Sequence, residues 1–172
     1  MRIFTGTGDG GETTTLSGQK VSKNDVVIHF EGTADELNSH LGLIKAMLSD
    51  RGIRQFIEGI QINLMKIMAH VSDRANERYF LGDEEAGGLE REIDRLSANL
   101  PPLSEMVLPG KTPIEAHIHI ARSVARRAER LFVAVNAEYP LCPKAGVYLN
   151  RLSDYLFTLS RTESIQAGLR DA

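Results

Sequence analysis

Apolar residues recur at three- and four-residue spacing in five separate stretches of this chain, which is the pattern of helices that bury one face. The stretches predict helices from Thr33 to the break at Asp50, over 53–78, over 89–100, from Thr112 to the loop at Pro140, and over 145–165. Because the connections between the helices are short, this pattern favours an all-α, five-helix up-and-down bundle.

Capping residues mark where two of these helices begin. Thr33, followed by acidic Asp35, favours one helix start, and Thr112 with Pro113 at the first helical position favours another. We therefore expect a single domain over 1–172, with an irregular N-terminal segment at 1–31, a helical bundle at 33–165 and a tail at 166–172.

The overall charge and composition exclude several classes of protein. A net charge of -3 argues against a general nucleic-acid binder, because such domains carry a strong basic excess. No apolar run approaches the ~18–20 residues of a membrane span, and the N-terminus has no apolar signal core. Cys142 is the only cysteine, and no neighbouring histidine is placed to activate it. We expect a cytoplasmic protein that acts on small molecules, with no nucleic-acid or membrane partner and a structural cysteine.

Positive charge is concentrated in the fourth predicted helix. The cluster consists of Arg122, Arg126, Arg127, Glu129 and Arg130. Like charges at i and i+4 oppose each other by roughly 0.2–0.5 kcal/mol per pair in an isolated helix, so the cluster predicts a bound anion. Guanidinium groups are planar forks of donors that suit phosphate or carboxylate oxygens. We expect the stripe formed by Arg122, Arg126 and Arg130 to line a cleft or a subunit boundary.

The N-terminal segment is rich in glycine and threonine. Gly6, Gly8 and Gly11 satisfy the dinucleotide-binding pattern G-x-G-x-x-G, but the strand–turn–helix context that this pattern requires is not predicted around them, so a Rossmann-type site is excluded. Glycine lets backbone N–H groups approach phosphate oxygens, and threonine hydroxyls can donate to phosphates or contact a metal. Two interpretations remain open, a phosphate-binding loop and a flexible tail.

Other polar positions also have more than one interpretation. Lys23 could add charge to a phosphate site or be a solvated surface lysine. Asp35 could cap a helix or orient an arginine from another helix. On a helix, His117 and His119 point about 200° apart and do not easily hold one metal ion, so we expect surface or interface histidines.

Six short motifs occur along the chain in a fixed order. They are Thr5-x-Thr7-Gly8-Asp9, Ser22-Lys23-Asn24-Asp25, Gly32-Thr33-x-Asp35-Glu36-Leu37-Asn38, Leu108-Pro109-Gly110, Arg126-Arg127-Ala128-Glu129-Arg130 and Tyr148-Leu149-Asn150-Arg151-Leu152-Ser153-Asp154. In these motifs the chain resembles, from Ile3 to Arg161, the trimeric cob(I)alamin adenosyltransferases of the five-helix-bundle, propanediol-utilisation type. Six motifs in order make this resemblance specific.

The resemblance implies a transferase that moves the 5′-deoxyadenosyl group of ATP to the cobalt of cob(I)alamin and releases triphosphate. It implies a homotrimer in which the N-terminal loop of one subunit and the arginine helix of its neighbour hold ATP. The implied ATP contacts are Thr5, Gly6, Thr7, Gly8, Thr13, Thr14, Lys23, Arg126, Arg127, Ala128, Glu129, Arg130 and Asn150. Mg²⁺ would be bound mainly through ATP, with no protein ligand assigned. A reductase and an adenosylcobalamin-dependent acceptor enzyme would be the protein partners.

The resemblance also implies catalytic roles, and the chain departs from the family at three positions: Gly6, Gly10, where the family commonly has a charged residue, and Met106. Arg126 would act on the triphosphate, and Arg122 would pair with Asp35 across the subunit boundary. Gly6 stands where the family usually has Lys or Arg, and Met106 stands where it often has phenylalanine, whose ring helps to displace the lower ligand of cobalamin. Met106 would fill this space on the lower face of cobalamin. The departures leave an alternative, a non-catalytic nucleotide- or corrinoid-binding trimer that is a carrier or sensor on the same scaffold.

Overall fold

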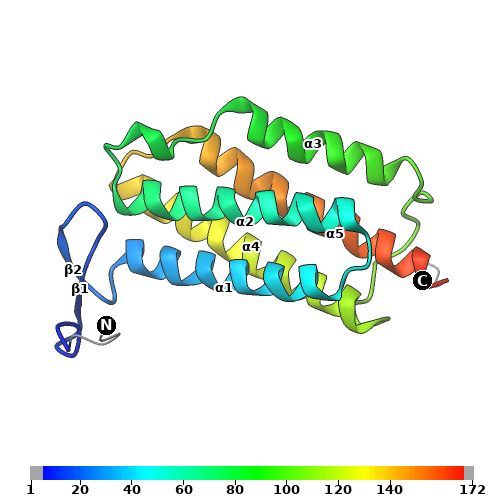
Figure 1. Cartoon of the computed structure of the whole chain (residues 1–172), viewed down its shortest axis with the longest axis horizontal. Helices are drawn as coiled ribbons and strands as arrows, with labels where there is room; N and C mark the ends of the chain where they lie inside the picture. Colours follow the sequence, from blue (N-terminus) through cyan, green and yellow to red (C-terminus); the bar gives the residue numbers. More distant parts are fainter. Residues whose placement is uncertain (1–5, 169–172) are drawn as a thin grey trace.

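The structure is a computed structural model that describes residues 6–168. Within these residues five α-helices form an elongated up-and-down bundle, with a small β-hairpin at one end (Figure 1). The elements are β1 (Glu12–Thr14), β2 (Lys20–Ser22), α1 (Val26–Met47), α2 (Arg51–Ser72), the short 3₁₀ helix η1 (Glu77–Tyr79), α3 (Asp83–Ser97), α4 (Pro113–Glu138) and α5 (Pro143–Gln166). The prediction of an all-α five-helix bundle is confirmed, while assembly into a trimer stays a prediction.

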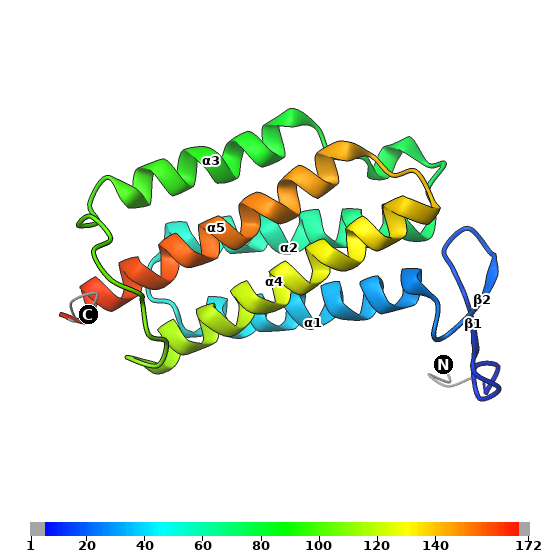
Figure 2. The ribbon, with the colours of Figure 1, turned by 180° about the vertical axis from the view of Figure 1, so that it is seen from behind.

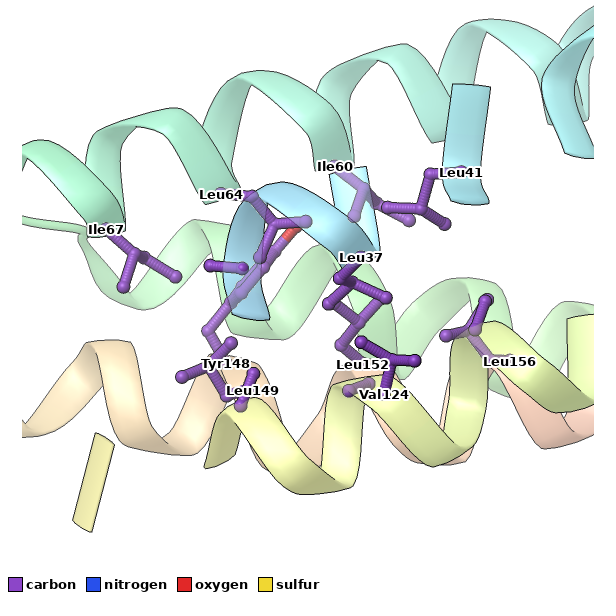
Figure 3. Close-up of a cluster of buried hydrophobic side chains, with 14 of the residues drawn as sticks. Leu37, Leu41, Ile60, Leu64, Ile67, Val124, Tyr148, Leu149, Leu152 and Leu156 are labelled. Carbon is purple, nitrogen blue, oxygen red and sulfur yellow. The ribbon is translucent and has the colours of Figure 1, made fainter. Parts of the chain in front are cut away.

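Helix α4 packs against both α1 and α5, while α2 packs on α1 and α3 packs on α5. Helices α4 and α5 lie side by side in the view from behind (Figure 2). The hydrophobic core takes side chains from all five helices, and Figure 3 shows part of it. Leu37, Leu64, Leu149 and Leu152 are fully buried there. Burial of one leucine side chain contributes ~1.5–3 kcal/mol, so this core is the main source of stability.

Helix α1 begins at Val26, so the predicted start at Thr33 is wrong. Asp25 is the N-cap, and its carboxylate accepts a hydrogen bond from the backbone N–H of Val27 at 2.9 Å. Val27 and Phe30 are buried and continue the apolar stripe of α1 toward the N-terminus. The helical part therefore extends into the segment expected to be irregular, and Asp35 lies inside a helix and caps none.

The rest of the N-terminal segment contains a hairpin, which the expectation of an irregular segment missed. Strands β1 and β2 are antiparallel, with Thr13 opposite Val21. Gly18 has φ +85° in the connecting turn, a conformation that glycine adopts without strain. Three residues per strand are too few to show an alternating apolar pattern. The backbone N–H of Leu16 donates to Ser72 Oγ at 2.8 Å and holds the hairpin against the end of α2.

The boundary between the second and third helices also differs from the prediction. Helix α2 ends at Ser72, before the expected position 78, and α3 begins at Asp83, inside the stretch expected to be a polar break. At the start of α3 the Glu85 carboxylate accepts a hydrogen bond from the backbone N–H of Gly82 at 2.8 Å. Because α3 carries three acidic residues in its first turn, the helix dipole favours a helix start there despite the glycines that follow.

The start of α4 matches the prediction. Thr112 is the N-cap, its hydroxyl accepts a hydrogen bond from the backbone N–H of Glu115 at 3.2 Å, and Pro113 is the first helical residue. Helix α5 begins at Pro143, two residues before the expected position. None of the helices in the described part of the chain is both long and apolar enough to cross a membrane.

Candidate functional site

The arginines of α4 surround a surface hollow of about 620 Å³. Its walls come from α4, from Glu36 on α1 and from Pro109 and Gly110 in the α3–α4 connection. Arg122, Arg127 and Arg130 line it. Three guanidinium groups around one hollow have the charge and the hydrogen-bond donors that suit an anion with several oxygens, and the bound anion itself stays a prediction.

Arg127 forms an ion pair with Glu36, which links α4 to α1. The two side chains are 47% and 46% exposed, so water screens the pair and its contribution to stability is ~0–1 kcal/mol. The carboxylate therefore acts chiefly to hold the Arg127 guanidinium in place at the edge of the hollow. Glu36 was not among the predicted site residues, although it follows Asp35 in the same motif.

Three members of the arginine motif, Arg126, Ala128 and Glu129, are not among the residues that line this hollow. Arg126 is exposed on α4. The side chain of Ala128 is fully buried in the core. The stripe predicted from spacing alone contained Arg126. The hollow is lined by Arg127 instead, because its other walls come from α1 and from the α3–α4 connection.

A second polar network joins α4, α5 and α3. The Asn150 side-chain amide donates to Glu129 Oε1 at 2.8 Å, and Asn150 Oδ1 accepts from Arg151 Nη1 at 2.8 Å. Arg151 Nε donates to Glu90 Oε1 at 2.7 Å. The structure thus brings together two predicted site residues, Glu129 and Asn150, and adds Arg151 and Glu90, for which the sequence offered only the motif around Asn150.

A buried polar pair lies at the base of the arginine hollow. Nε2 of His119 is 3.0 Å from Oε1 of Glu115, and the two side chains are 5% and 0% exposed. Arg122 Nε donates to His119 Nδ1 at 3.4 Å. Burial lowers the pKa of His119, the Glu115 carboxylate opposes this shift, and the Arg122 guanidinium adds to it. The expectation of a surface or interface histidine is therefore wrong for His119, which is buried inside the bundle beside the Glu115 carboxylate.

The glycine-rich loop before β1 lies next to Lys23. A Cβ on Gly8 would be 3.1 Å from Lys23 Nζ, so the lysine side chain lies directly against the backbone of the loop. Gly6 and Gly11 have φ +74° and +82°. Thr13 and Thr14 follow on β1, while Thr5 lies outside the described residues. The structure thus places Gly8 and Lys23 together, as a phosphate-binding loop requires.

Asp35 lines a different hollow, of about 430 Å³, together with Glu31 on α1 and Leu16 after β1. Burial raises the pKa of the Glu31 carboxyl, and a hydrogen bond from Ser72 opposes this shift. Arg122 is not part of this second hollow. Within one chain the predicted partners Asp35 and Arg122 therefore face different surface hollows, and each is open to a partner from outside the chain.

Met106 lies in the connection between α3 and α4 and is 94% exposed. Leu103 and Leu108 in the same connection are also exposed. The hairpin and this connection lie at opposite ends of the bundle (Figures 1 and 2). The part of the chain described by the structure gathers no group of three or more His, Cys, Asp or Glu side chains able to hold a metal ion.

Comparison with known proteins connects these features to a family. Residues 3–163 match the sequence model described as Cobalamin adenosyltransferase. A corrinoid adenosyltransferase of Citrobacter freundii is 38% identical over 168 residues, which cover 94% of each chain. Corrinoid adenosyltransferase PduO of the same organism is 37% identical and covers 97% of this chain, which spans about half (51%) of that relative's length.

A solved structure has the same fold. It is a variant of a PduO-type ATP:corrinoid adenosyltransferase from Lactobacillus reuteri, complexed with cobalamin and ATP. The two structures superpose with a TM-score of 0.92 at 30% identity, covering 99% of this chain and 97% of that chain. The likeness therefore extends over the whole bundle and includes the hairpin end.

Proposed function

This chain belongs to the cobalamin adenosyltransferase family, and we propose that it transfers the 5′-deoxyadenosyl group of ATP to the cobalt of cob(I)alamin. The products are adenosylcobalamin and triphosphate. Corrinoid adenosyltransferases of the same length as this chain, among them one with ATP and cobalamin bound, support the proposal. The single observation that carries it in the structure is the hollow lined by Arg122, Arg127 and Arg130.

The chemistry requires positioning and charge stabilisation more than a reactive side chain. The Co(I) centre supplies the electron pair for the new cobalt–carbon bond, the 5′ C–O bond breaks, and its electrons leave on the triphosphate oxygen. Guanidinium groups that already surround the leaving group stabilise that developing charge without reorganisation. Holding the 5′ carbon close to the cobalt lowers the entropic part of the barrier.

ATP is proposed to lie between the Gly8–Lys23 loop and the arginine helix. Thr5, Gly6, Thr7, Gly8, Thr13, Thr14 and Lys23 would contact the triphosphate from one side, and Arg126, Arg127, Arg130 and the Glu129–Asn150 network from the other. The side chain of Ala128 is buried, so only its backbone is left for a nucleotide contact. Mg²⁺ is proposed to be held by triphosphate oxygens, where it would supply further positive charge.

The two sides are proposed to come from different subunits of a homotrimer. Arg122 and Asp35 line different hollows of one chain, which supports pairing between subunits. Such a contact joins two different surfaces, and a contact of this type forms a ring when its rotation closes. Exposed Leu43 and Met47 on α1 and Ile120 and Val133 on α4 would be buried in such an assembly.

An anaerobic absorbance assay tests the proposed function. With ATP, Mg²⁺ and chemically reduced cobalamin, the wild-type protein is expected to form adenosylcobalamin over several turnovers. Arg126→Ala is expected to lose nearly all of this activity, because its guanidinium group is proposed to contact the triphosphate from outside the arginine hollow and to stabilise the charge that develops as the triphosphate leaves. Arg91→Ala, on the exposed face of α3, is the matched control and should keep it. A folded wild-type protein without turnover would overturn the proposal.

Two observations favour a second candidate, a nucleotide- or corrinoid-binding trimer without catalysis. Met106 is almost completely exposed, and Gly6 contributes no cation to the loop. This candidate predicts tight binding of ATP or adenosylcobalamin in calorimetry, together with no product in the absorbance assay. The same two measurements therefore separate the two candidates.

A further inference from the structure

The connection between α3 and α4 is tied down at both ends. We call residues 101–111 the strap. At its start, Arg161 on α5 donates from Nη2 to the Pro101 carbonyl at 2.6 Å. At its end, the backbone N–H groups of Gly110 and Lys111 donate to Glu115 Oε2 at 2.8 and 3.0 Å. Exposed Met106 lies between the two ties.

Glu115 is more than a helix cap. In a capping box a Glu at the third helical position accepts a hydrogen bond from the N-cap backbone, and is usually at the surface. Here the carboxylate is fully buried and accepts hydrogen bonds from the backbone N–H groups of Gly110 and Lys111, which both precede the N-cap. Gly110 has φ +110°, which turns the chain so that both N–H groups meet one oxygen. Burial of a carboxylate is costly unless every oxygen has a partner.

The second oxygen of Glu115 connects the strap to Arg122. Among the described residues neither Glu115 Oε1 nor His119 Nε2 has a regular hydrogen-bond partner, yet the two atoms face each other at 3.0 Å. Since His119 Nδ1 accepts from Arg122 Nε, the ring proton is on Nε2 and points toward the carboxylate. One buried series of contacts therefore runs from the strap backbone through Glu115 and His119 to Arg122.

We propose that Glu115 is a positioning residue that sets the place of the strap, and with it Met106, relative to Arg122. One of its oxygens fixes the end of the strap, and the other fixes the His119 ring that orients the guanidinium group. The inference rests on the proposed function, with Met106 of the strap at the lower face of cobalamin and Arg122 paired with Asp35 across the subunit boundary, as the family resemblance implies. Arg122 lines the arginine hollow but is proposed to pair with Asp35 of a neighbouring subunit, so the proposed triphosphate contacts of Arg127 and Arg130 are left unchanged.

The variant Glu115→Gln keeps the contact with the strap backbone and changes the contact with His119. The glutamine carbonyl oxygen can still accept from Gly110 and Lys111, but its amide group then donates toward His119 Nε2. The ring proton must move to Nδ1, where it opposes the Arg122 Nε–H group. We expect the KM for cob(I)alamin to rise about tenfold, the size of one lost hydrogen bond to a charged group, and the KM for ATP to stay within about twofold.

His119 supplies an independent pair of variants. His119→Gln keeps a donor toward Glu115 and an acceptor toward Arg122, so it should retain the KM for cob(I)alamin. His119→Leu removes both and should reproduce the effect of Glu115→Gln. Glu138→Gln, at the exposed end of α4, is the control for loss of one carboxylate from the same helix. With MgATP and cob(II)alamin bound, the optical signature of cobalamin that has lost its lower ligand should weaken in Glu115→Gln and His119→Leu. It should stay unchanged in His119→Gln and Glu138→Gln.

The outcomes distinguish this inference from the function on which it rests. A wild-type protein without turnover would overturn the proposed function itself. An active wild type whose Glu115→Gln variant matches Glu138→Gln for both substrates would overturn the positioning role. Equal rises in both KM values, or a lower melting temperature with unchanged kinetics, would show that Glu115 is only a cap. If Glu115→Gln does not fold, equal behaviour of His119→Gln and His119→Leu would overturn it.

Discussion

Asn150 on α5 donates its side-chain amide to Glu129 on α4 at 2.8 Å, which joins two motifs 21 residues apart in the sequence. The same Asn150 accepts from Arg151, so its amide is held at both ends. Glu129 lies next to Arg130 in the sequence, and its negative charge would lower the affinity of the proposed site for an anion unless a hydrogen-bond donor held the carboxylate. The hydrogen bond from Asn150 directs the Glu129 charge toward α5.

Replacement of Asn150 by Ala is expected to release Glu129, while Arg151 keeps its contact with Glu90. Because the two lost hydrogen bonds are only part-buried, we predict a loss of ~1 kcal/mol in the free energy of unfolding. We also predict weaker ATP binding in calorimetry, because the free Glu129 carboxylate would then compete with the triphosphate for the arginines. Asn99→Ala, at an exposed position after α3, is the control and should change neither quantity. Unchanged ATP affinity in Asn150→Ala would contradict the role given to this network.

Gly6 is expected to be needed for its backbone conformation. Its φ of +74° costs a residue with a side chain ~1–2 kcal/mol. Gly6→Ala should therefore weaken ATP binding by roughly 5–30-fold at that cost, and Gly6→Lys should offset only part of the loss through its charge. Gly10→Ala is the matched control, since Gly10 has no positive φ and a Cβ there would meet no atom within 4 Å. Equal ATP affinities for Gly6→Ala and Gly10→Ala would show that the loop rearranges on binding.

The trimer is tested by the charges of Asp35 and Arg122. Light scattering of the wild-type protein should give three times the 19.0 kDa chain mass. Arg122→Asp and Asp35→Arg should each lower activity at least about tenfold, as expected for a charge left without its partner, and the double exchange should restore much of it. An active monomer, or a double variant no better than either single one, would argue against pairing across a subunit boundary.

The stability of the bundle is expected to fall in mild acid because of His70. Its Nε2 accepts the backbone N–H of Cys142 at 2.9 Å, which requires the neutral ring. Burial, with a smaller contribution from Arg74, lowers the pKa of His70 below its usual value. A histidine whose pKa is lower in the folded state contributes stability that is complete above the unfolded pKa of about 6.5 and is lost as the pH falls below it.

Denaturant titrations at pH 7.5 and 5.5 measure this effect. The free energy of unfolding of the wild-type protein should fall between these pH values by up to ~1.4 kcal/mol per pH unit for one proton. His70→Gln should be less stable at pH 7.5 and should show a smaller fall with pH. His29→Gln, at an exposed histidine, should keep the wild-type fall. Parallel curves for the wild type and His70→Gln would rule out His70 as the group responsible.

The helical bundle was predictable because burial repeats along each helix. Leu37, Leu41 and Ile44 report the face of α1 that packs on the core, whatever the partner helix is. The start of α1 was missed because Thr33 resembles a cap, although Asp25 makes the hydrogen bond to the helix N-terminus. Hairpin strands of three residues carry too little pattern to be recognised.

Only the part of the site that lies in short sequence motifs was predictable. The arginine cluster was evident from charge on one helix, and its anion stays a prediction. That Arg127 and not Arg126 lines the hollow depends on which neighbouring elements pack beside α4. The buried contact between Glu115 and His119 was not predicted, although Thr112-x-x-Glu115 fits the capping-box pattern and His119 lies one turn further along the helix. Spacing places residues on a face, but only packing determines their burial.

The central proposal is that this protein forms a cobalt–carbon bond at the expense of ATP. The most direct measurement is product analysis after anaerobic incubation of the wild-type protein with ATP, Mg²⁺ and cob(I)alamin. We predict adenosylcobalamin and inorganic triphosphate in equal amounts. Bound ATP and corrinoid that remain unchanged, or release of phosphate or diphosphate without adenosylcobalamin, would contradict the proposed reaction.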